Sequence, residues 1–252
     1  MQLAYAYEPT YNDRMSALLD RVDYRLAVSD EDREAIFRLR YEAYRREQSI
    51  AECSSGMFCD DYDEKGNVKL FGVYIDGRLV SSIRVHIANS SSPIFPSFGP
   101  FSDILQPEID AGKTVIDPTR FVTDKAASQE FKGLPHLTLR LGWLAAEYYN
   151  AEHFLVAIRV EHQAFYRRTF QHQAICEART YPLLAAPISL MTVSREVASK
   201  HVLRRYPFYR SSAFERRMLF GAPTPSRVEP VVRESHLKLV EPQLSGHLAS
   251  AN

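Results

Sequence analysis

The sequence predicts an α/β domain whose mixed β-sheet carries helices on both faces and contains a central pair of parallel strands that splay apart. Three observations predict this class. Strand and helix periodicities alternate along the chain, residues 115–160 read as strand, helix and strand, and Asp76-Gly77 separates two β-prone runs. A helical crossover joins parallel strands in a right-handed sense, whereas an Asp-Gly turn joins antiparallel strands. Where the parallel strands part, their open backbone edges can grip an extended ligand arm.

The composition is that of an ordinary globular protein. The chain has 252 residues, 45% hydrophobic and 25% charged, which is enough for one sizeable core. We therefore expect a single domain over residues 1–220, with its core at about 22–195, and a C-terminal tail at 221–252. The formal net charge of +0 gives no general attraction to nucleic acid. No apolar run is long enough for an integral membrane segment.

Two further features favour a cytoplasmic protein. The first residues lack the basic and apolar regions of a secretion signal. The three cysteines, Cys53, Cys59 and Cys176, are odd in number and form no C-x-x-C motif. A reducing compartment is therefore the simplest expectation.

The N-terminal quarter predicts a helix, a strand and a second helix. Residues 1–20 hold a short amphipathic segment around Met15. Residues 22–28 alternate apolar and polar positions, as a half-buried strand does. Ser29 then provides an N-cap for the second helix. Periodicity fails over residues 47–67, where we expect a long surface loop.

The remaining elements begin with a hairpin. Its strands are residues 68–75 and 78–87, on either side of the Asp-Gly turn. Residues 88–114 contain four prolines and read mainly as a connection. A helix begins at Leu134 and presents an apolar stripe at steps of three and four. The other expected segments are strands at 115–122, 153–160, 174–181 and 188–193, and a helix at 161–171.

An acidic cluster, Asp60-Asp61-Tyr62-Asp63-Glu64, precedes the hairpin. It is either a solvated loop or half of an ion-pair scaffold in which Asp60 and Asp63 face Arg40 and Arg84. Arg84 supports the scaffold, because it sits within a β-prone run where an unpaired charge facing the core is costly. An outward-facing Arg84 would be a surface residue.

A second candidate is Asp117-Pro118-Thr119-Arg120-Phe121. Alternation places Asp117, Thr119 and Phe121 on one face of this strand and Pro118 and Arg120 on the other. The proline indicates a bulge or a missing ladder bond, which would free backbone groups beside a ligand. An edge strand with ordinary polar residues is the alternative.

No motif predicts a metal site or a nucleotide-binding loop. The histidines are dispersed, and the sequence contains neither H-E-x-x-H nor paired cysteines. It also lacks G-x-x-x-x-G-K-[ST] and G-x-G-x-x-G. Nothing singles out a cysteine–histidine nucleophile pair. We expect no metal and no bound cofactor.

Basic residues gather near the C-terminus. Residues 195–217 contain seven Lys and Arg against two Glu, and Arg167 and Arg168 add to this excess. Interleaved aromatic residues are compatible with RNA, an acidic protein partner fits the same field, and a solvated helix face is the third interpretation.

Four motifs in this order together resemble those of autoinducer synthases, the acyl-homoserine lactone synthases on the GNAT acyltransferase fold. Within that group, the chain is more similar to long-chain N-acyl amino acid synthases. The resemblance covers about residues 22–195. The motifs are Phe37-Arg38-Leu39-Arg40-Tyr41-Glu42-Ala43-Tyr44, Asp60-Asp61-Tyr62-Asp63, Arg84 in the hairpin, and Asp117-Pro118-Thr119-Arg120-Phe121.

This resemblance implies a GNAT-like mixed sheet and transfer of a fatty acyl group from acyl carrier protein to the amine of an amino acid. It also implies that Arg40, Asp60 and Asp63 bind substrate within a buried charged network with Arg84. Tyr44 is a further substrate-binding residue, and Arg120 joins the site. Two departures weaken the case for a lactone product. Asp117 stands where lactone synthases usually carry glutamate, and their N-terminal tryptophan has no counterpart, since the one tryptophan is Trp143.

The expected mechanism is attack of an uncharged amine on a thioester carbonyl. Asp117, with a pKa raised by burial, or a water molecule would accept the proton. Backbone N–H groups near Phe121 and Val122 would stabilise the oxyanion. Arg84 or Arg120 would hold the acceptor carboxylate. Trp143 is a candidate for the acyl pocket, with core packing as its alternative role.

The loop before the helix at Leu134 indicates which acyl donor the protein uses. Ordinary GNAT enzymes bind the coenzyme A pyrophosphate on glycine amides, but Phe131-Lys132-Gly133-Leu134-Pro135 offers one glycine and a proline. We expect the phosphopantetheine of acyl carrier protein as donor, with Arg167, Arg168, Arg204 and Arg205 docking the acidic carrier. Coenzyme A dependence, a lactone synthase, and an inactive GNAT-like binding module are the alternatives.

Overall fold

The computed structural model describes residues 8–181 and 186–221, which belong to one compact unit. The expected tail at 221–252 lies outside the described residues apart from Gly221. The expected domain limits, 1–220, stay a prediction. No helix within the described ranges is long and apolar enough to cross a membrane.

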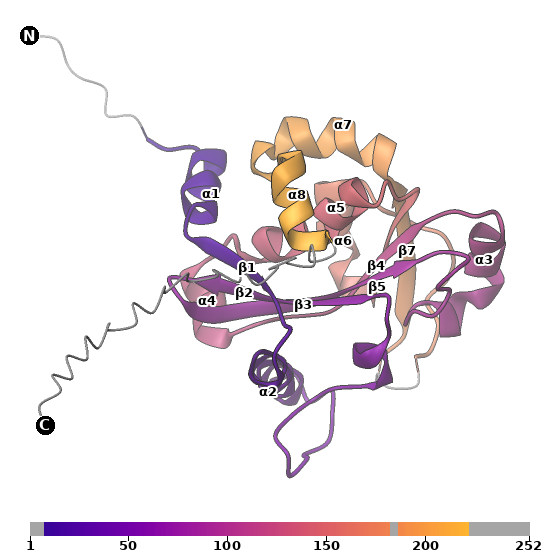
Figure 1. Cartoon of the computed structure of the whole chain (residues 1–252), viewed down its shortest axis with the longest axis horizontal. Helices are drawn as coiled ribbons and strands as arrows, with labels where there is room; N and C mark the ends of the chain where they lie inside the picture. Colours follow the sequence, from indigo (N-terminus) through magenta and orange to yellow (C-terminus); the bar gives the residue numbers. More distant parts are fainter. Residues whose placement is uncertain (1–7, 182–185, 222–252) are drawn as a thin grey trace, which may run out of the picture. The chain divides into compact units, whose positions relative to one another are not determined.

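The described strands form a seven-stranded sheet in the order β1-β2-β3-β4-β5-β7-β6 (Figure 1). β4 and β5 pair in parallel, and the other described neighbours pair antiparallel, so the predicted mixed sheet is confirmed. The strands are β1 (Val22–Leu26), β2 (Val68–Ile75), β3 (Arg78–Ala88), β4 (Val115–Thr123), β5 (His153–Arg159), β6 (Gln173–Ala174) and β7 (Ile188–Ser194).

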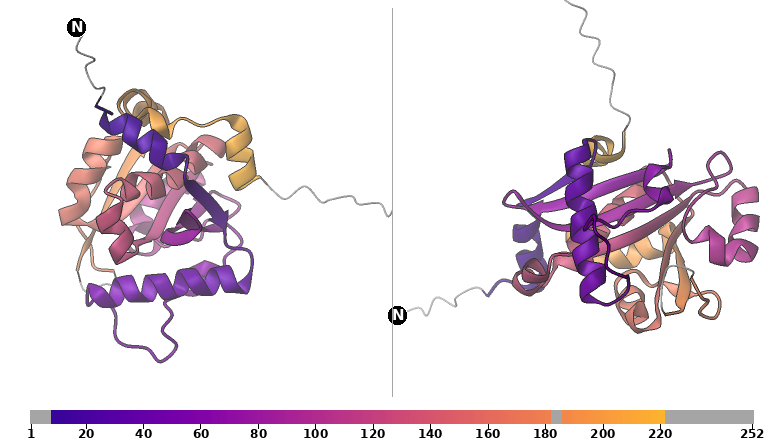
Figure 2. Two further views of the ribbon diagram at one scale, coloured as in Figure 1. Left: turned by 90° about the vertical axis from the view of Figure 1, so that its left-hand side faces the viewer. Right: turned by 90° about the horizontal axis from the view of Figure 1, so that it is seen from below.

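Helices cover both faces of the sheet, as expected. Figures 1 and 2 show α2 on one face and α5, α7 and α8 on the other. The α-helices are α1 (Tyr11–Leu19), α2 (Asp30–Arg46), α3 (Phe98–Asp110), α4 (Lys125–Glu130), α5 (Leu134–Tyr148), α6 (Gln163–Phe170), α7 (Arg195–Arg205) and α8 (Ala213–Phe220). The short 3₁₀ helices are η1 (Asp61–Glu64), η2 (Val160–His162) and η3 (Pro207–Tyr209).

The parallel strands pair only at their beginnings. Val115 lies opposite His153 and Ile116 opposite Phe154, and no later residues of β4 and β5 are paired. The predicted splay is therefore present, and it leaves backbone edges of both strands open beyond Ile116 and Phe154.

A β-bulge in β4 reorganises the residues that border this opening. Ser82 pairs with Val122 but Arg84 pairs with Thr119, so Arg120 and Phe121 together oppose a single residue of β3. Arg120 has a φ of 52°. The predicted sharing of one face by Asp117, Thr119 and Phe121 is wrong, because the extra residue shifts the alternation. Phe121 packs against the main core, while Arg120 turns toward α2.

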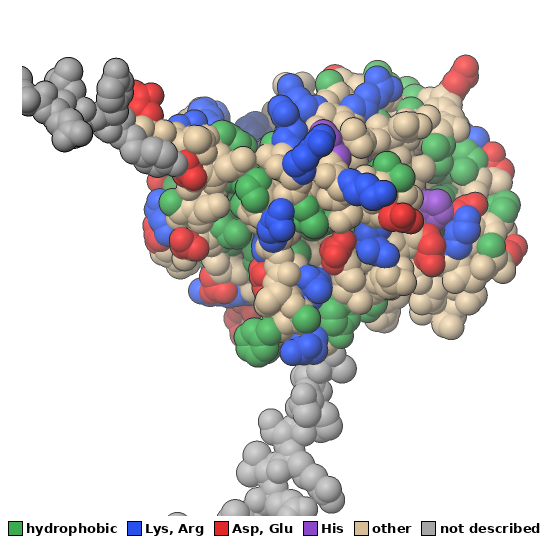
Figure 3. Space-filling model, turned by 90° about the horizontal axis from the view of Figure 1, so that it is seen from above, with side chains coloured by type: hydrophobic (Ala, Val, Ile, Leu, Met, Phe, Trp, Pro, Cys, Tyr) green, Lys and Arg blue, Asp and Glu red, His purple; other side chains and the backbone are tan. Residues whose placement is uncertain are grey.

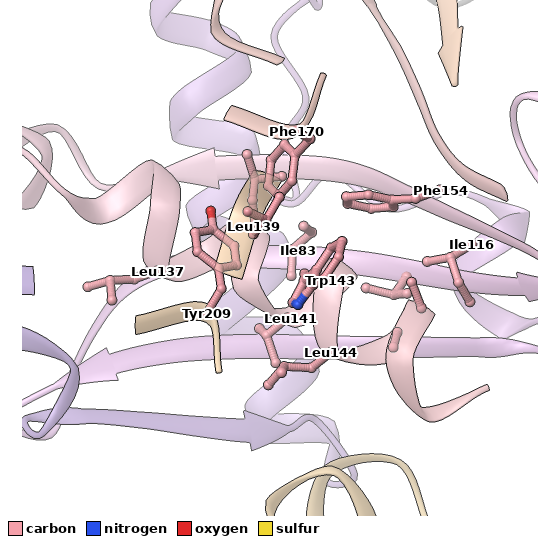
Figure 4. Packing of buried hydrophobic residues seen from close by; sticks show 14 of the residues in the cluster. Ile83, Ile116, Leu137, Leu139, Leu141, Trp143, Leu144, Phe154, Phe170 and Tyr209 are labelled. Atoms are coloured by element: carbon pink, nitrogen blue, oxygen red, sulfur yellow. The ribbon is translucent and has the colours of Figure 1, made fainter. Parts of the chain in front are cut away.

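The main core lies between α5 and the sheet. Residues 137–146 of α5 are buried all round, because the sheet covers one side and other helices cover the opposite side. Trp143 stacks on Phe170, with ring centroids 6.5 Å apart, and Phe170 meets Phe154 edge to face (Figure 4). The predicted stripe of α5 is thus part of a wider apolar surface.

Three predictions about elements are wrong. Residues 88–114 contain α3, whose Phe101, Leu105 and Ile109 pack into a second core cluster despite Pro107 inside the helix. α4 lies within a stretch for which no helix was expected. The strand expected at 174–181 is reduced to β6 and one isolated bridge, from Arg179 to Ile188. In α3, core contacts outweigh the turn signals of the prolines.

Candidate active site

Five charged side chains meet in one buried network. Arg40 Nη1 donates to Asp63 Oδ1 and Oδ2 at 2.8 and 3.0 Å. Arg84 Nη1 lies 2.5 Å from Asp60 Oδ1 and 3.1 Å from Asp63 Oδ1. Arg120 donates to Asp60 Oδ2 from Nη2 at 2.6 Å and from Nε at 3.1 Å. Of the two interpretations of the acidic cluster, the structure therefore shows the ion-pair scaffold of Asp60 and Asp63 with Arg40 and Arg84, and it adds Arg120.

The backbone around η1 holds the two carboxylates in place. Asp60 caps η1 by accepting a hydrogen bond from Tyr62 N at 3.0 Å. Asp63 Oδ2 accepts in return from Asp60 N at 3.0 Å. This reciprocal capping box fixes the D-x-x-D spacing, so both carboxylates face the arginines.

The network carries an excess of one positive charge, because three guanidinium groups face two carboxylates. Burial acts to raise the pKa of Asp60, but Arg84 and Arg120 outweigh it and hold the pKa at about 2. The pKa of Asp63 is also lowered, since Arg40 and Arg84 overcome its burial. Burial lowers the pKa of Arg40 to about 10. Asp60, Asp63 and Arg40 are therefore charged near neutral pH.

Two neutral residues complete the network. Thr119 Oγ1 accepts from Arg84 Nε at 3.0 Å, and Tyr44 Oη accepts from Arg120 Nη1 at 3.2 Å. Arg120 also lies over the Phe58 ring, 4.5 Å from its centroid. These contacts fix the directions of both guanidinium groups beside the strand opening.

A pocket of about 80 Å³ lies beside the charged network. It reaches from β4 to Ala157 on β5, so it lies where the two strands separate. Its lining residues are Tyr44, Arg84, Pro96, Ser97, Thr119, Arg120, Ala157, Tyr181 and Ile188. Sequence reasoning assigned no site role to Pro96, Ser97, Ala157, Tyr181 or Ile188, which carry no recognisable motif.

Asp117 is fully buried and does not line this pocket. Its Oδ1 accepts from Ser97 Oγ at 2.8 Å, and its Oδ2 accepts from Ser97 N at 3.1 Å. Burial raises the pKa of Asp117 to about 6, against the lowering effect of the Ser97 hydrogen bonds and Arg84. Asp117 is therefore a much stronger base than an exposed aspartate.

Arg40, Asp60 and Asp63 belong to the charged network but do not line the pocket, and three further expected site residues lie outside both. Val122 packs with Leu39 and Ala43 of α2, and its carbonyl accepts from Ser81 Oγ at 2.6 Å. Phe121 packs against the main core. Trp143 is buried within that core and does not border the pocket (Figure 4). Their expected roles in oxyanion stabilisation and acyl binding stay predictions.

The four arginines expected to dock a carrier protein are exposed on two helices that contact each other. Arg167 and Arg168 belong to α6, and Arg204 and Arg205 belong to α7. Figure 3 shows Lys and Arg side chains spread over the side of the molecule that carries α7 and α8. Arg195 does not add to this surface, because it pairs with Glu147 at 3.9 Å.

A larger, open hollow of about 410 Å³ lies on this basic side. It is lined by α7 residues, among them Lys200 and Arg204, and by Gln171 at the end of α6. We favour the smaller pocket as the reaction site, because the charged network and the open strand edges converge there. Among the described residues, no group of three or more His, Cys, Asp or Glu could hold a metal.

The N-terminus of α5 has its N–H groups occupied. Leu134 N donates to Phe131 O at 3.0 Å, and His136 N and Leu137 N donate to Gly133 O at 2.9 and 3.3 Å. Pro135 has no N–H to offer. Met15 of α1 covers Gly133 so closely that an added Cβ would lie 2.1 Å from its Sδ. This helix terminus is therefore closed to a pyrophosphate.

The chain is similar in sequence to N-acyl amino acid synthases and to an acyl-homoserine-lactone synthase. The family model for N-acyl amino acid synthase FeeM matches residues 35–194. An acyl-homoserine-lactone synthase from Pectobacterium parmentieri is 31% identical over 130 residues, which are 51% of this chain and 58% of that protein. The match thus spans less than two thirds of the length of this curated relative.

Solved structures agree on the fold. FeeM from uncultured soil microbes matches with a TM-score of 0.59 at 18% identity, covering 73% of this chain and 96% of FeeM. The coenzyme A-dependent acyl-homoserine lactone synthase BjaI matches with a TM-score of 0.55 at 13% identity, covering 74% of this chain and 89% of BjaI. These likenesses confirm the GNAT-like fold that the sequence predicted.

Proposed function

The chain belongs to the FeeM family of N-acyl amino acid synthases, and from this membership we propose that it transfers a fatty acyl group from acyl carrier protein to the amine of an amino acid. The observation that carries this proposal is the pocket where β4 and β5 part, bordered by Arg84 and Arg120. An extended thioester arm fits between open strand edges. The positive excess of the charged network suits the carboxylate of the acceptor.

The reaction needs three things from the site. The acceptor carboxylate lies against Arg84 or Arg120, which directs its amine toward the strand opening. The thioester carbonyl lies along β4, where N–H groups near Phe121 and Val122 meet the developing oxyanion. Asp117, whose pKa is raised to about 6, takes up the amine proton, because its basicity matches neutral conditions.

The closed N-terminus of α5 supports a carrier protein over coenzyme A as donor. Coenzyme A carries a pyrophosphate that a helix N-terminus binds through free N–H groups. Here those groups are bonded internally and Met15 covers Gly133. Carrier-bound phosphopantetheine has one phosphate, held at the carrier's own surface. The relative BjaI is coenzyme A-dependent, so both donors are compared in the assay.

The carrier docks on the exposed arginines of α6 and α7. Within the described part of the chain, Arg168 and Arg204 have no ion-pair partner, so their charge is available to an acidic surface. α6 follows β5 through η2, which puts Arg168 shortly after the strand that borders the pocket, and α7, which carries Arg204, contacts α6. Because acyl carrier proteins and free thiols both belong to the cytoplasm, we place the reaction there.

A direct assay tests the proposal. Purified protein is supplied with an acyl carrier protein or coenzyme A thioester of the same fatty acid and with a panel of amino acids, and products are identified by mass spectrometry. We expect N-acyl amino acids with the carrier donor and at least tenfold lower kcat/KM with coenzyme A, about 1.4 kcal/mol of discrimination. A preference for coenzyme A would overturn the donor, and no acylated amine from either donor would overturn the function.

A lactone synthase is the second candidate, because the curated relative is one. Adding S-adenosylmethionine to the acceptor panel separates the two. Formation of an acyl-homoserine lactone with no N-acyl amino acid would replace our first proposal by the second.

A further inference from the structure

We propose that Ser97 is a catalytic residue that carries a proton from the attacking amine to Asp117. This inference rests on the proposed N-acyltransferase function and deepens it by adding a proton path. Ser97 is itself only 1% exposed, yet it lines the pocket, whereas the fully buried Asp117 does not. Ser97 Oγ is therefore the group through which Asp117 communicates with a pocket ligand.

The hydrogen bonds around Ser97 have the direction that such a relay requires. Ser97 Oγ donates to Asp117 Oδ1 at 2.8 Å, and the backbone N–H of Ser97 occupies Oδ2 at 3.1 Å. Both carboxylate oxygens are thus engaged by one residue. The hydroxyl oxygen keeps its acceptor lone pairs for a donor on the pocket side.

The position of Ser97 before α3 supports a role other than helix capping. A serine at an N-cap ordinarily accepts a hydrogen bond from the first turn of its helix. Ser97 occupies the N-cap of α3, yet its side chain makes no capping bond. Its hydroxyl is instead committed to β4, where Asp117 belongs to the strand that borders the opening.

The proton and electron balance is simple. The acceptor enters with its amine uncharged, after its ammonium proton has gone to solvent. Its nitrogen forms a bond to the thioester carbonyl carbon and the carbon–sulfur bond breaks. The nitrogen then loses a proton to Ser97 Oγ as the Ser97 hydroxyl proton moves to Asp117. The leaving thiolate takes up that proton as it returns along the same path, which restores Ser97 and Asp117.

The surroundings of Asp117 suit a base that works near neutral pH. Arg84 on β3 is the charged group that acts on it, and the uncharged His86 lies opposite it across the β3–β4 pair. Burial lowers the pKa of His86 to about 3, so this histidine stays neutral. Burial raises the pKa of Asp117 to about 6. The relay is therefore active above about pH 6, where the Asp117 carboxylate is ionised, and inactive below it, where the protonated Asp117 can accept no further proton.

The test uses the full-length protein with acyl carrier protein thioester and the preferred amino acid from the panel. Kinetics are measured for wild type, Ser97→Ala, Asp117→Asn and the double variant over a range of pH. Ser97→Thr keeps the hydroxyl. Ser189→Ala is the matched control, since Ser189 is a buried serine that accepts from Gln163 outside the pocket.

We expect Ser97→Ala to lower kcat by about 10²-fold or more, with little change in KM for the amino acid. Ser97→Thr should restore much of the rate, and Ser189→Ala should match wild type. The double variant should be no slower than the slower single variant, because residues that act as one unit are not additive. The acid limb of the wild-type pH profile should be absent from Ser97→Ala.

Several outcomes would overturn the relay. They are a kcat for Ser97→Ala within about threefold of wild type, strictly multiplicative effects in the double variant, or an acyl adduct on Ser97 by mass spectrometry, which would make it a nucleophile. If Ser97→Ala does not fold, Ser97→Cys replaces it and should be slow, because a thiol hydrogen-bonds weakly. A wild type that acylates nothing overturns the proposed function itself, which distinguishes the two failures.

Discussion

At the scale of single residues, the charged network contains more positive than negative groups and leaves buried arginine atoms without hydrogen-bond partners in the described part of the chain. Arg40 is fully buried, and its Nε and Nη2 have no partner among the described residues. Such atoms are costly to bury, and the carboxylates of Asp60 and Asp63 are shared among three guanidinium groups. Because three guanidinium groups share two carboxylates, the network beside the pocket has one positive charge that no carboxylate of the described residues balances. That charge is what an acceptor carboxylate would neutralise.

Arg84→Ala should remove product formation while the protein stays folded. The substitution leaves two arginines facing two aspartates, so no buried carboxylate loses every partner. We expect the free energy of unfolding to fall by about 1–3 kcal/mol from lost charged hydrogen bonds. Mass spectrometry of products, denaturant unfolding and circular dichroism measure these effects. Arg78→Ala is the control, because Arg78 lies on the same strand but pairs with exposed Glu130 outside the pocket. Near-normal activity of Arg84→Ala would remove Arg84 from the site.

Asp117 should make the protein less stable as pH rises. Its pKa is about 6 in the folded state against an ordinary 3.8, so between these values the folded protein keeps a proton that the unfolded chain has released. Stability therefore falls over this window by roughly 3 kcal/mol and stays lower above it. Asp60 acts in the opposite sense, since the stability it contributes is lost only as pH falls through about 2.

Comparison of wild type with Asp117→Asn isolates this effect. Denaturant unfolding of both proteins at about pH 4.5 and about pH 7.5 avoids the titration of Asp60. The wild type should lose stability relative to the variant between the two conditions. If the difference in unfolding free energy between wild type and Asp117→Asn is the same at both pH values, Asp117 has an ordinary pKa in the folded protein.

At the scale of elements, α5 determines how β4 and β5 are held. Gly142 lies in the middle of this helix, and an added Cβ would meet Pro118 Cγ at 2.8 Å and Phe154 Cε2 at 3.0 Å. The helix thus approaches both parallel strands closely where they begin to separate. Glycine inside a helix is about 1 kcal/mol less favourable than alanine, and here it allows the helix to pack closely against Pro118 and Phe154.

Gly142→Ala should therefore destabilise the protein although alanine is the better helix former. We expect a net loss of about 1–3 kcal/mol, because the Pro118 ring cannot turn away from the new methyl group. Gly99→Ala in α3 is the matched control, since nothing lies within 4 Å of its added Cβ, and it should be neutral or stabilising. Thermal unfolding measures both. Equal melting temperatures would show that α5 can move away from β4 without cost.

At the scale of the whole described unit, the reaction pocket and the basic surface belong to different parts of the fold. The pocket lies at the β4–β5 opening, and the arginines lie on α6 and α7. In the proposed function, a small acceptor would meet the first and a carrier protein the second. Electrostatic steering should therefore act on the donor alone.

Salt should weaken the use of the carrier donor but not of the amino acid. Between about 50 and about 500 mM salt, screening shortens the range of exposed charges, so KM for the acyl carrier protein should rise. Arg167→Glu/Arg204→Glu should raise that KM further and reduce its salt dependence. The KM for the amino acid should stay constant in both proteins. A carrier KM independent of salt and of these charges would exclude this docking surface.

The sequence by itself determined the order of the elements and the identity of the charged residues. Val22–Leu26, the hairpin about Asp76-Gly77, β4, α5 and β5 follow from periodicity and turn chemistry, because those signals are local. The segment Phe37–Tyr44, the segment Asp60–Asp63, Arg84 and the segment Asp117–Phe121, taken in order, indicated the family. α3 was not predicted, since four prolines mask the four-residue spacing of Phe101, Leu105 and Ile109.

The tertiary structure alone decided which of these residues share the pocket. The bulge at Arg120 moved Phe121 to the opposite face, and the placement of Ser97 beside Asp117 joins segments twenty residues apart through no motif. The N–H groups at the start of α5 are occupied by the carbonyls of Phe131 and Gly133, and Met15 from the distant α1 covers Gly133. Local patterns specify which backbone forms, but contacts between distant segments specify which side chains meet, and those contacts depend on packing across the whole core.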